Sequence, residues 1–179
     1  MEKQLKHISK FMSLVLRHKP EEIGLQINSE GWADVTELIE KLTAHGVSVN
    51  MATIDIVVET NEKKRFIFNE DKTMIRASQG HSIDVELNLP EVQPPLYLYH
   101  GTVAKYTDSI MSEGLKKMSR QHVHLSIDKE TAANVGSRRG VPVILTVRAG
   151  DMYKNGLKFY LSANAVWLTD AVPAEYISQ

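Results

Sequence analysis

Arginine and histidine recur in this sequence where an element of the chain is predicted to begin or end. Leu16–Lys19 closes an apolar run, Lys63–Phe66 enters a predicted hairpin, and Arg120–Ser126 carries one arginine and two histidines. Arginine is permanently charged and holds a dianion through paired hydrogen bonds. A histidine beside it can donate to a phosphate oxygen or transfer a proton near neutral pH. Each motif alone is typical of a structural or surface role, but together they predict a phosphate-handling site.

Three further segments have residue types that suit anion binding. Arg76–Ser82 combines a cation, an amide, a glycine and two more donors in one predicted loop. Tyr99–Thr102 is predicted to close a strand at a glycine, where backbone N–H groups become accessible. Gly136–Gly140 forms a third cationic loop. Taken singly, these too favour structural or surface roles.

Several kinds of active site are excluded because their signatures are missing. The sequence has no GxGxxG, GxxxxGK[ST], HExxH or GxSxG motif. With 0 Cys, it has no disulfide, no thiol nucleophile and no cysteine-ligated zinc. His122 and His124 would face one side of a strand, as two metal ligands might, but no third ligand is obvious. We therefore expect no metal.

The overall composition is that of an ordinary globular protein. The 179 residues are 42% hydrophobic and 24% charged, and 21 Lys+Arg against 22 Asp+Glu leave a net charge of -1. Nucleic acid would therefore meet a local basic patch and not a global positive field. The sequence shows no signal peptide and no apolar stretch long enough to span a membrane. We expect a cytoplasmic, soluble monomer.

Helical and strand periodicities place the first group of motifs. Apolar residues from Leu5 to Leu16 follow a helical pattern that should stop at Lys19-Pro20. A second helix is predicted from Asp34 to near Gly46, and Asn50 can cap a third. Phe66 and Phe68, followed by a strand over 74–77, predict a hairpin. Three helices followed by a hairpin are typical of a winged-helix domain.

Three prolines between Leu87 and Leu96 indicate a domain boundary, because they cannot continue a helix or a central strand. We predict a first domain over 1–88, a linker over 89–95 and a second domain over 96–179. The second domain has four strand-like runs, at 96–99, 123–125, 143–147 and 165–168. Two short helices are expected at 109–113 and 128–135. The fold class is therefore α+β, with a mainly β second half.

These motifs, in this order, resemble the RNA 2'-phosphotransferase family, NAD-dependent enzymes related to the tRNA-splicing 2'-phosphotransferase. The resemblance runs nearly end to end and rests on Leu16–Pro20, Gly31-Trp32, Lys64–Phe66, Ile75–Ala77, Gln79–Ser82, Tyr99–Thr102, Arg120–Ser126, Val172-Pro173 and Glu175–Ile177. It implies an N-terminal winged helix joined to a C-terminal ADP-ribosyltransferase-like domain. It also implies that NAD is consumed as a co-substrate and that the other substrate is a 2'-phosphorylated RNA.

The resemblance assigns roles residue by residue. The catalytic residues would be Arg17, His18, Arg65 and Arg120. NAD would be positioned by His100, Gly101, Thr102, His124, Ser126 and Arg138. The flanking RNA would be recognised by Lys64, Arg76, Gln79 and His81.

The implied reaction has two steps. An RNA 2'-phosphate attacks the nicotinamide-bearing ribose carbon of NAD and expels nicotinamide. The ribose 2''-hydroxyl then attacks that phosphorus, which releases 2'-OH RNA and ADP-ribose 1'',2''-cyclic phosphate. Val166 stands where protein-modifying ADP-ribosyltransferases have a glutamate, which weighs against a protein acceptor. Ala165 stands where many relatives would have glycine.

Two other functions remain open from the residues. A transcription regulator would need a basic recognition helix, yet the third predicted helix, Met51–Glu59, has no Lys or Arg. An ADP-ribosyltransferase that stops after the first step would have no use for Arg17, His18 and Arg65.

Overall fold

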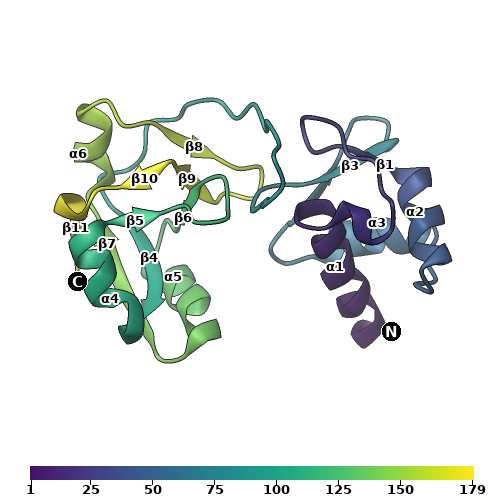
Figure 1. Ribbon diagram of the computed structural model, residues 1–179, viewed down its shortest axis with the longest axis horizontal. Coiled ribbons are helices and arrows are strands. Elements are labelled where there is room, and N and C mark those ends of the chain that lie inside the picture. Colours follow the sequence, from purple (N-terminus) through teal and green to yellow (C-terminus); the bar gives the residue numbers. More distant parts are fainter. The chain divides into compact units, whose positions relative to one another are not determined.

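A computed structural model describes all residues, 1–179, and the chain divides into two compact units, Met1–Asn88 and Leu89–Gln179 (Figure 1). Each unit has its own hydrophobic core. The whole is mixed α and β, with six α-helices and several small antiparallel sheets, which agrees with the predicted α+β class.

The helices of the first unit begin and end where local signals place them. They are α1 (Glu2–Arg17), α2 (Val35–Ala44) and α3 (Met51–Thr60), with a 3-10 turn at Pro20–Glu22. Asp34 caps α2 by accepting a hydrogen bond from the Glu37 N–H at 2.8 Å, and Asn50 caps α3 by accepting from the Thr53 N–H at 2.9 Å. The three predicted helices are confirmed.

A three-stranded antiparallel sheet completes the first unit. Its strands are β1 (Ala33–Asp34), β2 (Phe66–Phe68) and β3 (Met74–Ala77), in the order β1-β3-β2. Strands β2 and β3 form the predicted hairpin, with Ile67 opposite Arg76. The helices cover this sheet with a buried apolar core that includes Met12, Leu38 and Ile54, all 0% exposed. Burial of this kind is what holds short helices in place.

The second unit alternates short strands and helices. In chain order it contains β4 (Leu98–Val103), α4 (Ala104–Glu113), β5 (Leu115–Lys116), β6 (Val123–Leu125), α5 (Lys129–Gly136), a 3-10 turn (Ser137–Arg139), β7 (Pro142–Val147), α6 (Ala149–Lys154), β8 (Phe159–Leu161), β9 (Trp167–Thr169), β10 (Ala171–Val172), a 3-10 turn (Ala174–Tyr176) and β11 (Ile177–Ser178). The sheets have the orders β11-β7-β4, β6-β9-β8 and β10-β5.

This unit has more helices and strands than the sequence predicted. Helix α6 was not predicted, and it adds a third helix to the two expected ones. The short strands β5, β8, β10 and β11 were missed as well. Leu96 and Tyr97, predicted to begin a strand, lie outside β4 and are 65% and 51% exposed. Within the proline-containing segment, Glu91 forms a bridge with Tyr160.

The predicted end of a strand at Gly101 was wrong. Strand β4 continues through this glycine to Val103, and Gly101 lies opposite Ile144 of β7. Helix α5 packs so closely on the strand that a Cβ at Gly101 would lie 1.7 Å from the carbonyl oxygen of Ala132. The glycine therefore permits a close helix–strand contact and does not end the strand.

No helix combines the length and the apolar character that are needed to cross a membrane.

Candidate functional site

In the first unit, the candidate site begins at the end of α1. Arg17 is the last helical residue, and His18 follows it with its N–H donating to the Leu14 carbonyl at 3.0 Å. The Arg17 carbonyl, left without a partner inside the helix, accepts from the N–H groups of Ser82 at 3.0 Å and Ile83 at 3.3 Å. The loop that contains Ser82, 65 residues further along the chain, thus holds the end of α1 in place.

The same loop also contacts the imidazole of His18. The Ser82 hydroxyl lies 2.8 Å from His18 Nδ1, which fixes the orientation of the ring. The sequence analysis counted Ser82 among the donors of this segment but did not predict its contact with His18, because the two residues lie far apart in the sequence.

The start of the hairpin is tied to the other end of this loop. The Ser78 N–H donates to the Arg65 carbonyl at 2.8 Å, and the Ser78 hydroxyl donates to the Lys64 carbonyl at 2.9 Å. Lys64 has a positive φ of 43°, and its ammonium donates to the Glu59 carbonyl at 2.6 Å. The loop over 78–82 thus joins the backbone at Arg17 to the backbone at Arg65. We call Arg17, His18 and Arg65 the helix-end cluster.

A buried histidine lies within this loop. His81 is 1% exposed, and neither ring nitrogen has a hydrogen-bond partner. Burial, together with the positive charges of Arg17, Arg76 and His18, lowers the pKa of His81 to about 4. His81 is therefore a neutral group inside the first unit at physiological pH. The interaction with Arg17 and His18 also places it next to the helix-end cluster.

Arg76 and Gln79, two of the predicted RNA contacts, are also partly or wholly enclosed. The Arg76 guanidinium lies over the ring of Trp32, 4.5 Å from its centroid, and donates to the Glu30 carbonyl at 3.2 Å. Burial lowers the pKa of Arg76. Gln79 is 8% exposed and its Oε1 has no partner. These side chains shape the interior of the loop more than its outer surface.

In the second unit, two histidines and an arginine form a connected group. His100 on β4 donates from Nδ1 to the carbonyl of His124 on β6, at 3.3 Å. An Arg120 Nη1–H group donates to His124 Nδ1 at 3.2 Å. Because Nδ1 of His124 accepts this hydrogen bond, the neutral ring has its proton on Nε2. Burial is the main cause that lowers the pKa of His100, which keeps this ring neutral.

Three guanidinium groups raise the local positive charge. Burial, followed by the charges of Arg139 and Arg138, lowers the pKa of Arg120, although an arginine stays protonated. The charge of Arg139 also lowers the pKa of His100. None of the three ion pairs in the structure involves these arginines. The sequence analysis placed both Arg138 and Arg139 in one cationic loop and assigned only Arg138 to NAD. Adjacent loop residues have no periodicity from which the directions of their side chains could be predicted.

The other predicted NAD contacts lie on the same strands. Tyr99 and Ser126 exchange two backbone hydrogen bonds, at 2.9 and 2.8 Å, and so join β4 to the end of β6. Thr102 is buried within β4, and Gly101 packs against α5. We call Arg120, His124 and His100, with Arg138 and Arg139, the strand cluster.

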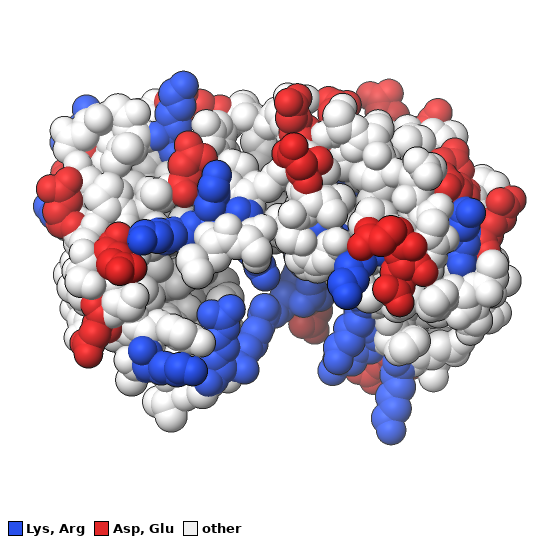
Figure 2. Space-filling view, viewed as in Figure 1, with Lys and Arg blue, Asp and Glu red and all other residues white.

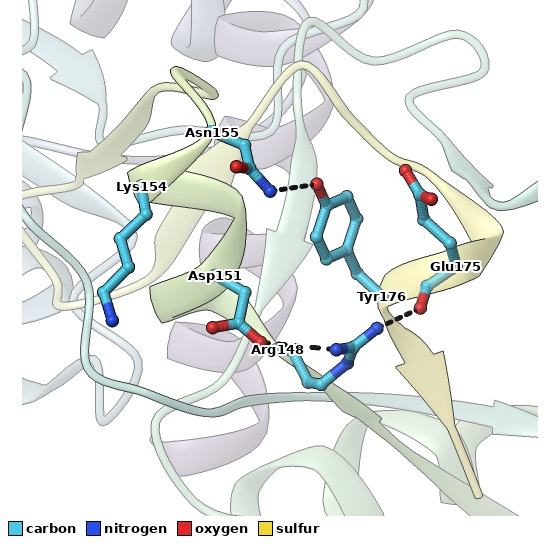
Figure 3. Close-up of a pocket in the computed structure, with 6 residues that line it drawn as sticks. All are labelled: Arg148, Asp151, Lys154, Asn155, Glu175 and Tyr176. Atoms are coloured by element: carbon cyan, nitrogen blue, oxygen red, sulfur yellow. Dashed lines mark hydrogen bonds and ion pairs between the residues drawn. The ribbon is translucent and has the colours of Figure 1, made fainter.

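One pocket in the second unit contains none of the predicted residues (Figure 3). Its lining residues are Arg148, Asp151, Lys154, Asn155, Glu175 and Tyr176. Arg148 is occupied by internal partners, the Asp151 carboxylate at 3.3 Å and the Glu175 carbonyl, and the Asn155 amide donates to the Tyr176 hydroxyl at 2.8 Å. These bonds join α6 to the chain before β11.

No group of three or more His, Asp or Glu residues is placed to hold a metal ion. The arrangement instead offers fixed cations and neutral imidazoles. Such groups bind phosphate oxygens and stabilise charge that develops on them. The fold and the two clusters therefore define an α+β protein of two units, each with a group of residues suited to phosphorylated ligands.

Comparison with known proteins identifies the family. The model of the "RNA 2'-phosphotransferase, Tpt1 / KptA family" matches residues 3–171. A probable RNA 2'-phosphotransferase of Flavobacterium johnsoniae is 69% identical over 172 residues, which cover 96% of this chain and 94% of that protein. One of Fusobacterium nucleatum is 54% identical, covering 95% and 96%. The chain belongs to the RNA 2'-phosphotransferase family, as its motifs predicted.

Proposed function

We propose that this protein removes an internal 2'-phosphate from RNA in an NAD-dependent reaction. The observation that carries the proposal is the loop over 78–82, which holds the backbone of Arg17 and Arg65 and the ring of His18. A dianionic phosphate needs several fixed cations at one place, and membership of the family makes RNA the phosphate donor. The three helices and hairpin of the first unit serve as a winged-helix domain in this proposal, and the second unit serves as an ADP-ribosyltransferase-like domain.

The helix-end cluster holds the 2'-phosphate. The guanidinium groups of Arg17 and Arg65 bind its oxygens, and the His18 imidazole donates to it or moves a proton. The ring of His18 needs a fixed direction for either task, which the Ser82 hydroxyl at 2.8 Å supplies. His81 is neutral and enclosed, so its part is to support the loop from within.

The strand cluster holds NAD, the second substrate. Three arginines without an ion pair suit the two negative charges of a pyrophosphate. Since His100 donates from Nδ1 to a carbonyl, its Nε2 can accept from a ribose hydroxyl. The Nε2–H of His124 can donate to a second oxygen. These are hydrogen bonds that orient a dinucleotide.

The reaction then proceeds in two balanced steps. A phosphate oxygen attacks the ribose carbon that bears nicotinamide, and the C–N bond breaks with its electron pair leaving on nicotinamide. The adjacent 2''-hydroxyl loses its proton and attacks the phosphorus. The bond to the RNA 2'-oxygen breaks, and that oxygen takes up a proton. Charge builds on the phosphate in the second step, so the guanidinium groups of Arg17 and Arg65 contribute most there.

An assay with an internally 2'-phosphorylated oligonucleotide tests the proposal. With NAD, we expect loss of the phosphate from the RNA, release of nicotinamide, and ADP-ribose 1'',2''-cyclic phosphate as the nucleotide product. Arg65→Ala should slow the second step at least ten-fold more than the first, so that ADP-ribosylated RNA accumulates; about ten-fold corresponds to 1.4 kcal/mol.

Three results would overturn the proposal. Phosphate loss without NAD would exclude the mechanism. ADP-ribosylated RNA as the final wild-type product would show an enzyme that stops after the first step. No NAD-dependent change, together with tight binding of duplex DNA, would favour a transcription regulator.

A further inference from the structure

The face of α1 that points away from the core carries a row of cations. With 3.6 residues per turn, Lys3, Lys6, Lys10 and Arg17 lie within about 60° of one another around the helix axis. The buried residues of α1 lie on the other side, and they are Ile8, Met12, Val15 and Leu16. The three lysines are exposed, and Figure 2 shows Lys and Arg side chains projecting where Figure 1 draws α1. We call Lys3, Lys6 and Lys10 the lysine row.

The lysine row opposes the stability of its own helix. Cations near a helix N-terminus face the positive end of the helix dipole. Lys6 and Lys10 are four residues apart, a spacing at which like charges repel by about 0.2–0.5 kcal/mol. Glu2 is the one carboxylate in α1, and none of the three ion pairs in the structure involves the row. Helix stability therefore does not account for these lysines.

The rest of the first unit does not share this charge. Residues 1–88 contain 11 Lys+Arg and 14 Asp+Glu, a net charge of -3. Helices α2 and α3 together have four acidic residues and one lysine. A lysine row on a unit of net negative charge is thus a local patch that leads along one helix to Arg17.

We propose that the lysine row binds the RNA backbone on one side of the 2'-phosphate. This inference rests on the proposed function, in which Arg17 holds that phosphate. From Lys3 to Arg17 the helix rises about 21 Å, at 1.5 Å per residue. That length matches about six stacked nucleotides at 3.4 Å each. Lysine ammonium groups contact phosphates and do not distinguish the bases. The lysine row therefore lengthens the substrate site without adding a preference for RNA sequence.

The test uses three 2'-phosphorylated RNAs and two matched variants. The RNAs are a short one with a single nucleotide on each side of the modified residue, and two with an arm of about six nucleotides either 5' or 3' of it. The variant Lys3→Gln/Lys6→Gln/Lys10→Gln removes the row, and glutamine keeps a similar helix propensity. The control Lys105→Gln/Lys154→Gln/Lys158→Gln makes the same charge change in the second unit. Binding is measured by fluorescence anisotropy, and turnover is measured with NAD.

We expect wild-type protein to bind one of the two armed RNAs more tightly than the short RNA. In the row variant, the affinity for the armed RNA should fall by about ten- to hundred-fold at 0.1 M salt, so that the advantage of the arm is lost. The kcat of this variant for the short RNA should stay unchanged. The slope of log K against log salt should become shallower by about 2, because each single-strand contact contributes about 0.7. The control variant should keep the advantage of the arm.

Equal losses for all three RNAs, or an equal loss in the control variant, would overturn the lysine row as an RNA site. Turnover of the short RNA would in that case still support the proposed function. If wild-type protein turns over none of the RNAs, the proposed function fails, and the anisotropy data still decide whether the row binds an arm.

Discussion

At the scale of single residues, His81 is a neutral, buried side chain that lies close to the cations of the helix-end cluster. Its ring is 1% exposed and has no hydrogen-bond partner, while Arg17, Arg76 and His18 all disfavour a further positive charge. A protonated ring there would be costly. The loop that holds the helix-end cluster therefore depends on this imidazole staying neutral.

This predicts how stability changes with pH. The pKa of His81 is about 4 in the folded protein and 6.5 as the ordinary value, so between these pH values the unfolded chain binds the additional proton. The contribution of His81 is complete above pH 6.5 and is lost as pH falls toward 4, by up to about 3 kcal/mol in the free energy of unfolding. Urea unfolding in a Trp167→Phe background, in which Trp32 is the fluorescent reporter, measures this loss across the pH range.

A substitution isolates the effect. His81→Leu, or His81→Gln if the leucine variant does not fold, should flatten the pH dependence between 4 and 6.5 whatever it does to stability at pH 7. The exposed His7→Gln serves as the control and should keep the wild-type slope. An unchanged slope in both His81 variants would show that other groups cause the acid sensitivity.

At the scale of elements, the turn between β8 and β9 carries a strained residue. Ala165 has a φ of +62°, a left-handed conformation that costs an L-residue about 1–2 kcal/mol. The turn is closed by hydrogen bonds from Ala165 N–H to the Ser162 carbonyl and from Ser162 N–H to the Val166 carbonyl, at 3.0 and 2.9 Å. The glycine expected here from the family resemblance has a physical reason in this φ.

Ala165→Gly should therefore stabilise the second unit. Relief of the left-handed strain outweighs the added flexibility of glycine in the unfolded chain, which costs about 0.4–1 kcal/mol. We expect a net gain of about 0.5–1 kcal/mol in thermal or urea unfolding. Ala163→Gly is the matched control in the same turn, because Ala163 is exposed and has no positive φ, and it should destabilise. A loss in both variants would contradict this account.

How far the sequence predicts an element depends on where its determinants lie. The helices α2 and α3 were found because Asp34 and Asn50 cap them within four residues. The sequence placed the end of β4 too early, because Gly101 is required by the close packing of α5 on the strand. The contacting residue of α5, Ala132, lies 31 residues away in the sequence. Helix α6 has six residues, and β5, β10 and β11 have two each, too few for a periodic signal.

The candidate site divides in the same way. The types and order of Arg17, His18, Arg65 and Arg120 were readable from motifs. The burial of His81 and Gln79 could not be predicted, because a loop has no hydrophobic periodicity that indicates which side chains are buried. The contact of Ser82 with His18 joins residues 64 positions apart and is a product of tertiary structure alone.

At the scale of the whole molecule, the two units differ in charge and keep separate cores. The first has a net charge of -3, and the chain as a whole has -1, which leaves +2 for the second. Leu38 is fully buried in one core and Leu145 in the other. Each unit also holds one of the two tryptophans, Trp32 and Trp167. The stability of each unit can thus be followed separately.

We predict that the two cores can be destabilised one at a time. In a Trp167→Phe background, in which Trp32 reports on the first unit, Leu38→Ala should lower the free energy of unfolding by about 2–5 kcal/mol and Leu145→Ala should leave it unchanged. In a Trp32→Phe background, Trp167 reports on the second unit. There Leu145→Ala should lower the free energy of unfolding and Leu38→Ala should leave it unchanged. Urea titrations followed by tryptophan fluorescence measure both. If either leucine variant shifts both transitions equally, the chain unfolds as one cooperative structure and the cores are not energetically separate.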